Sequence, residues 1–123
     1  MSEDVRPLIA AAVHSVLDEV PALKPLKLVF GVDLKGRGDT QQFRVELPDV
    51  TVTKDIGVDA RIRVEMPRAF FNTMVEHGAK VADWREAFTY GQAKATGNTQ
   101  FLKLIRTVVD KQEERNRLRR AKH

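Results

Sequence analysis

Residues 88–98 read FTYGQAKATGN, and their pattern indicates how the second half of the chain folds. Gly91 is expected to end a helix, because glycine readily takes the left-handed conformation that follows a helical C-terminus. Residues 92–96 have the alternation of a short strand. Gly97 and Asn98 then form a turn into a last helix. The C-terminal part is therefore expected to run helix, strand, helix.

Two short helices are predicted just before this strand. Pro67 stands where a first helical residue would be, and Gly78 is a natural stop for the first of the two helices. Asp83 is predicted to be the N-cap of the second helix, with Glu86 three residues later in the spacing of a capping box. The bulky apolar residues of these two helices are Phe70, Phe71, Met74, Trp84 and Phe88.

Four strands are predicted upstream of the helices. Apolar and polar residues alternate over residues 26–34, 43–47 and 60–66, which is the period of a half-buried strand. Residues 50–56 can form another strand between them. Because short turns join these segments, a mainly antiparallel sheet is expected, with one apolar face and one solvated face of mixed charge.

A helix is predicted at each end of the chain. Residues 5–20 carry apolar side chains at the spacing of an amphipathic helix, with Asp4 as its N-cap. The last helix has an apolar stripe that begins at Phe101 and nearly vanishes beyond Val109. The 123 residues fit one domain, so we expect a single α+β domain over residues 1–123 with a basic tail at about 110–123.

The positive charge is concentrated in the last helix and tail. Residues 101–123 hold eight basic and three acidic residues, a balance of +5, whereas the rest of the chain has a balance of −1. Three interpretations stay open: a solvated helix end, transient contact with an anionic membrane, and binding to nucleic acid. Nucleic acid is the least favoured of these, since the tail has no aromatic residue and the body adds no basic excess.

The residue types argue against catalysis. The chain has no cysteine, which excludes disulfides and thiolate chemistry. His14, His77 and His123 are isolated, so neither a hydrolytic triad nor a metal site is indicated, and no cofactor is expected. No apolar run is long enough to span a bilayer, and the acidic start is unlike a secretory signal. We expect a cytoplasmic protein that is not an enzyme.

The stretch from Asp59 to Ile105 resembles the sterol carrier protein type 2 (SCP2) domain family. Residues 88–98 follow the pattern F-x-x-G-K-x-K-x-x-G-[DN] of that family, with Gln92 in place of the first lysine. The resemblance implies a five-stranded, mainly antiparallel sheet with helices packed on one face, enclosing an apolar tunnel. It also implies a non-catalytic lipid carrier for a sterol, a fatty acyl chain or acyl-CoA, or an isoprenoid.

The ligand would then touch apolar side chains of the sheet and helices, although the same residues could simply fill a core. Trp84 and Tyr90 have polar tips that could sit at a cavity mouth. The alternative function is a dimerisation or partner-docking module for a lipid-metabolising enzyme. The candidate ligand-binding residues are Phe43, Val45, Ile62, Val64, Phe70, Phe71, Met74, Trp84, Phe88, Phe101, Leu104, Ile105 and Val108.

Overall fold

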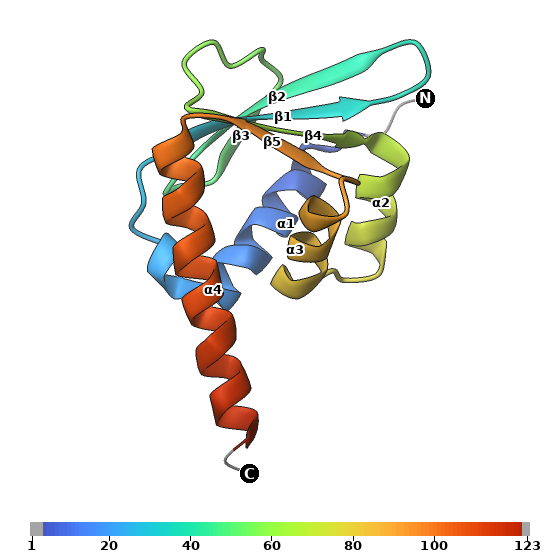
Figure 1. The fold of residues 1–123 in the computed structure, drawn as a ribbon. Helices are drawn as coiled ribbons and strands as arrows, with labels where there is room; N and C mark the ends of the chain where they lie inside the picture. The colour runs from blue at the N-terminus through green and yellow to red at the C-terminus, as the bar shows by residue number, and fades with distance from the viewer. Residues whose placement is uncertain (1–3, 122–123) are drawn as a thin grey trace.

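The computed structural model describes residues 4–121 and has a five-stranded sheet with the helices below one face (Figure 1). The strands lie in the order β3-β2-β1-β4-β5. Their bounds are Val29–Lys35 for β1, Thr40–Glu46 for β2, Thr51–Thr53 for β3, Ile62–Pro67 for β4 and Lys94–Gly97 for β5. The predicted α+β class and the five strands are confirmed.

The sheet is mixed, because its central pair is parallel. β1 pairs antiparallel with β2 and parallel with β4, while β2–β3 and β4–β5 are antiparallel. The chain thus makes a meander from β1 to β3 and then crosses back to the other side of β1. Residues 54–61 form this crossing, which passes over the face of the sheet opposite the helices (Figure 1).

The helical layer contains four α-helices and one short 3-10 helix. Their bounds are Arg6–Glu19 for α1, Pro21–Leu23 for η1, Arg68–Glu76 for α2, Val81–Thr89 for α3 and Thr99–Ala121 for α4. α4 is the longest, at 23 residues, and its C-terminal half extends beyond the other helices (Figure 1). The basic tail is therefore helical as far as Ala121, and residues 122–123 lie outside the described part.

Both predicted N-caps are wrong. α1 takes Val5 as its N-cap, and Asp4 instead accepts a hydrogen bond from the Arg6 backbone N–H at 3.0 Å. α3 begins at Val81, so Asp83 lies inside the first turn, where its carboxylate accepts the Lys80 N–H at 2.8 Å. The sequence pattern identified the polar residues near each start but placed the boundary one to three residues away.

The third and fifth strands are also shorter than predicted, and the bounds of the other three differ by one to three residues at each end. The third strand covers only Thr51–Thr53, because Gly57 takes φ 68° and its N–H bonds to the Asp55 carboxylate, turning the chain out of the sheet. The fifth strand starts at Lys94. Residues 92–93 lie instead in the turn that follows α3, and both of their N–H groups bond to the Ala87 carbonyl.

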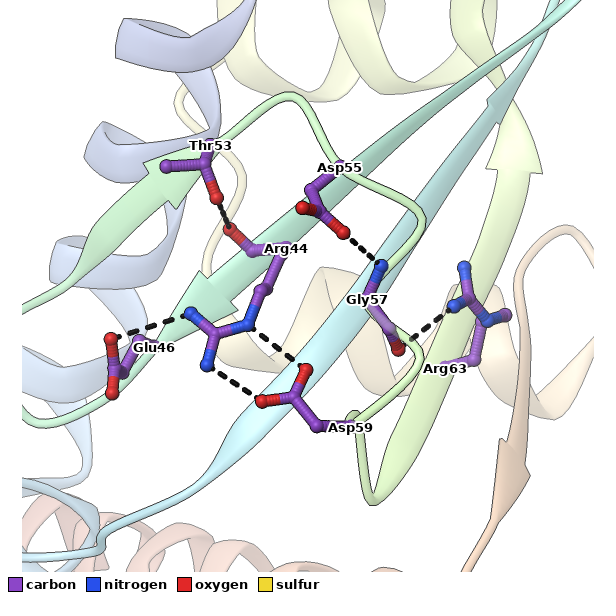
Figure 2. A network of polar contacts seen from close by, with 7 residues as sticks. All are labelled: Arg44, Glu46, Thr53, Asp55, Gly57, Asp59 and Arg63. Atoms are coloured by element: carbon purple, nitrogen blue, oxygen red, sulfur yellow. Dashed lines mark hydrogen bonds and ion pairs between the residues drawn. The ribbon is translucent and has the colours of Figure 1, made fainter.

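A network of ion pairs covers the outer face of the sheet (Figure 2). The Arg63 guanidinium lies across Gly31, where a Cβ atom would come within 2.8 Å of it, and bonds to Asp33 and to the Ile56 carbonyl in the crossing segment. Arg44 holds Asp59 in the same segment through two bonds of 3.0 and 2.8 Å. These two arginines fasten residues 54–61 over the sheet.

The charges in this network support one another. Its hydrogen bonds with Asp59 raise the pKa of Arg44, and the same bonds lower the pKa of the Asp59 carboxyl. Glu65, which pairs with Lys35, also has a lowered pKa for the same reason. The outer face is thus a solvated, self-paired surface, as its mixed charges predicted.

Candidate ligand site

The apolar core is closed below strands β1 and β2. Leu34 and Val45 of these strands are fully buried, and Ile9 and Leu17 of α1 belong to the same buried core. No polar or charged residue among those described is buried. This half of the molecule is a packed core in which ordinary burial of aliphatic side chains supplies the stability.

The side of the molecule at β5 and α4 is more open. Every residue of β5 is exposed, and α4 has no fully buried residue among those whose side chains the structure describes. An apolar stripe on α4 nevertheless packs against the core and is half-buried. It consists of Phe101, Leu102, Ile105, Val108 and Val109. α4 therefore covers apolar surface without sealing it.

α3 lies beside α4 and has a similar half-closed surface. Trp84 is half-buried and packs against Phe71 of α2 with 6.3 Å between ring centroids. Phe88, one turn further along α3, is 37% exposed, and Leu104 of α4 is 47% exposed. Large apolar side chains on both helices are thus accessible from outside.

Polar contacts at the ends and flanks hold these helices in place. The Val81 N–H at the start of α3 donates to the Glu19 carboxylate at 2.8 Å, which joins α3 to the end of α1. Arg85 pairs with Asp110 at 2.7 Å and joins α3 to α4. Asn98 caps α4, because its side-chain oxygen accepts two N–H groups of the first turn at 3.0 and 3.1 Å.

Two surface hollows flank α4. One, of about 440 Å³, is lined by Asp18, Glu19, Pro21 and Ala22 on one side and by Gln112, Arg115, Asn116 and Arg119 on the other. The second, of about 470 Å³, is lined by Arg85, Asp110, Glu113, Glu114 and Arg117. Both are mainly polar, and neither is lined by any of the predicted ligand-binding residues.

Solved structures with this architecture identify the fold. The chain superposes on sterol carrier protein 2-like 2 of Aedes aegypti with a TM-score of 0.54 and 16% identity, covering 83% of this chain and 96% of that one. It superposes on sterol carrier protein 2 of Yarrowia lipolytica with a TM-score of 0.53 and 20% identity, covering 85% and 83%. The chain has the SCP2 fold. The sheet and helices implied by the sequence resemblance are confirmed, and the apolar tunnel stays a prediction.

Two further SCP2-fold structures are relevant. A UbiJ-SCP2 ubiquinone synthesis protein superposes with a TM-score of 0.50 and 18% identity, over 89% of this chain and 99% of that one. The sterol carrier protein 2 of Aedes aegypti, solved in complex with palmitate, superposes with a TM-score of 0.54 and 11% identity, over 88% and 96%. No protein-family model and no curated protein matches the sequence.

The predicted ligand-binding residues fall into three groups in this SCP2 fold. The buried group is Phe43, Val45, Ile62 and Phe71. The half-buried group, which packs against the core, is Val64, Phe70, Met74, Trp84, Phe101, Ile105 and Val108. The exposed group is Phe88 and Leu104. The structure brings the first two groups together around one core, and contact of any of the residues with a ligand stays a prediction.

Sequence reasoning missed some residues of this region. Phe30 of β1 is half-buried against the core, and its place in an alternating strand was a usable signal. The polar end of α4 at Gln112, Arg115 and Arg119 was read only as part of a basic tail. Their helical spacing from Phe101 and Ile105 was the signal that could have placed them on the same face.

The described residues offer no group that suits metal binding. Within residues 4–121 there is no cluster of three or more His, Asp or Glu side chains able to hold a metal ion. His14 and His77 are exposed, and His123 lies outside the described part. The resolved pKa shifts belong to paired surface groups. No helix in the same range combines the length and the hydropathy needed to cross a bilayer.

Proposed function

We propose that this protein is a non-catalytic carrier that holds a lipid between its sheet and its helices. The observation that carries the proposal is the half-buried stripe on α4, which packs on the core although no described side chain of α4 is fully buried. A helix attached in this way is less firmly packed than the buried core and is the element we expect to move when a ligand enters. An apolar chain that enters there would be covered on both sides.

The energetics suit such a ligand. Burial of one methylene group contributes about 0.8 kcal/mol, so a long apolar chain binds well with few polar contacts. Several SCP2-fold structures support the same function, since the Aedes aegypti proteins described with palmitate share this architecture. The proposal concerns the class of ligand, and a sterol, a fatty acyl chain and an isoprenoid all belong to it.

The three groups of predicted residues take different roles in this proposal. The half-buried and exposed residues, such as Trp84, Phe88, Phe101 and Ile105, would contact the ligand. The buried residues, such as Phe43 and Val45, would form the rigid wall behind it. In this arrangement the buried residues would keep the fold intact when the site is empty. The less buried helices α3 and α4 would let the ligand enter and leave.

The accessible side chains on α3 and α4 also favour a second function. Phe88, Leu104 and Leu118 are large apolar residues that a partner could cover, and Tyr90, at the C-terminal end of α3, is 74% exposed. A second copy of the chain or a lipid-metabolising enzyme would fit this surface. The two functions predict different results in one experiment.

Native mass spectrometry of the gently purified full chain, followed by solvent extraction, tests the carrier. The expected result is co-purified lipid at close to one molecule per chain, or uptake of offered palmitate, cholesterol or a quinone precursor. A mass without lipid and without uptake of any of these would contradict the carrier. A dimer that persists on dilution, together with that lipid-free mass, would support the docking module.

A further inference from the structure

One face of α4 changes from apolar to cationic along its length. Positions 101, 105, 108, 112, 115 and 119 recur at intervals of three and four residues, so they share one face of the helix. Phe101, Ile105 and Val108 come first and are half-buried against the core. Gln112 follows, and the face ends in two arginines, Arg115 and Arg119.

The cationic end of this face opens into the hollow of about 440 Å³. The opposite wall is the end of α1 and η1, and includes the acids Asp18 and Glu19. At a rise of 1.5 Å per residue, Phe101 and Arg115 are about 21 Å apart along the helix. This span is comparable with the length of a long acyl chain.

The two acids of the hollow already have partners. Glu19 accepts the Val81 N–H at 2.8 Å, and Asp18 pairs with Lys24 at 3.5 Å. Within residues 4–121, no ion pair at 4.0 Å or less involves Arg115 or Arg119. The two guanidinium groups therefore line the hollow without an ion-pair partner of their own in the described part of the chain, at the end of an apolar stripe and opposite the two carboxylates.

We propose that Arg115 and Arg119 bind the anionic head group, a carboxylate or a phosphate, of a lipid whose chain lies along Phe101, Ile105 and Val108. The inference rests on the proposed carrier function and narrows its ligand to an anionic amphiphile. The guanidinium group suits this role because its planar set of N–H donors matches the oxygens of carboxylates and phosphates. A neutral lipid, such as a sterol, would leave both arginines unused.

The test compares lipids that differ only in the head group. Binding of palmitate, hexadecyl phosphate and hexadecan-1-ol is measured by competition with a fluorescent fatty acid, using the full chain. The test variant is Arg115→Gln with Arg119→Gln. The control is Lys111→Gln with Arg117→Gln, which removes the same charge from α4 at positions that do not line this hollow.

The unmodified chain should bind at least one anionic lipid about tenfold more tightly than the alcohol, as charged hydrogen bonds predict. The test variant should lose that preference and keep its affinity for the alcohol, which also shows that it is folded. The control should bind like the unmodified chain. A preference for one anionic lipid alone would assign the head group to that chemistry.

Three results would overturn the inference in distinguishable ways. Equal affinity of the unmodified chain for all three lipids would be consistent with the carrier function and would contradict the head-group site. If the test and control variants lost the preference for anionic lipids equally, the preference would come from the general positive charge of α4 and not from the hollow. Failure of all three lipids to bind the unmodified chain would overturn both the carrier and the head-group site.

Discussion

At the scale of single residues, two positions of α4 show the difference between the apolar face of that helix and its solvent face. Ile105 is half-buried against the core, whereas Thr107, two positions later, is exposed. Two residues turn a helix by about 200°, so the side chains point to nearly opposite sides. The same substitution at these two positions therefore has different consequences.

Ile105→Asp is expected to destabilise the fold by about 1–3 kcal/mol and to reduce lipid uptake, because it places a charge on the apolar face. Thr107→Asp should change the free energy of unfolding by no more than about 0.5 kcal/mol and leave uptake intact. Urea unfolding and native mass spectrometry with palmitate measure the two effects. Unchanged stability and uptake for Ile105→Asp would show that this face of α4 is misassigned.

How far the sequence predicts the fold also differs between residues. Alternation placed Phe43 and Val45 correctly on the buried face, because burial on one side of a sheet imposes a period of two. The same pattern could not show that β1 and β4 are parallel neighbours, since alternation specifies a face and not a partner strand. The half-buried state of Ile105 was equally hidden, because a packed stripe and a loosely packed one have the same spacing.

At the scale of elements, α3 depends on a residue from another helix. Glu19 at the end of α1 accepts the Val81 N–H at the start of α3. One of the unpaired N–H groups of that first turn is satisfied in this way, and the negative charge lies at the positive end of the helix dipole. Glu19 and Val81 are 62 positions apart. Local sequence therefore led to Asp83 as the cap and could not identify Glu19.

Glu19→Ala is expected to cost about 1 kcal/mol of stability, the usual effect of losing a capping side chain. Asp18→Ala is the matched control: Asp18 is the adjacent acid, and its pairing with Lys24 is exposed and long. The control should cost no more than about 0.5 kcal/mol. The midpoints of urea unfolding compare the two variants, and equal losses would mean that Glu19 does not act as the cap.

At the scale of the whole molecule, positive charge and the open apolar surface share the β5–α4 side. α4 leads from the half-buried stripe to Arg115, Arg117 and Arg119 in its C-terminal half. A lipid carrier of the kind proposed would collect its ligand from a membrane. An anionic surface would attract this end of the molecule first, by about 1 kcal/mol for each basic residue near it.

The full chain is accordingly expected to bind vesicles containing phosphatidylglycerol and not those of phosphatidylcholine alone, with binding that weakens as salt is added. Replacing Arg115, Arg117 and Arg119 together by Gln should weaken binding by about two orders of magnitude at low salt. Replacing the exposed Lys27, Lys54 and Lys80 by Gln removes the same charge from the body and should have little effect. Vesicle co-sedimentation measures both, and equal losses would refute a directed approach through α4.

The short edge strands have a consequence for self-association. Exposed apolar side chains carry a risk of aggregation. In an open sheet, aggregation commonly begins at the edge strands, because their free N–H and C=O groups can pair with another chain. Here β3 has three residues, and β5 has four, with Lys94 at its start and Gly97 at its end. Both edge strands are short, so they offer few backbone groups to another chain, although the apolar side of the molecule at β5 and α4 is open.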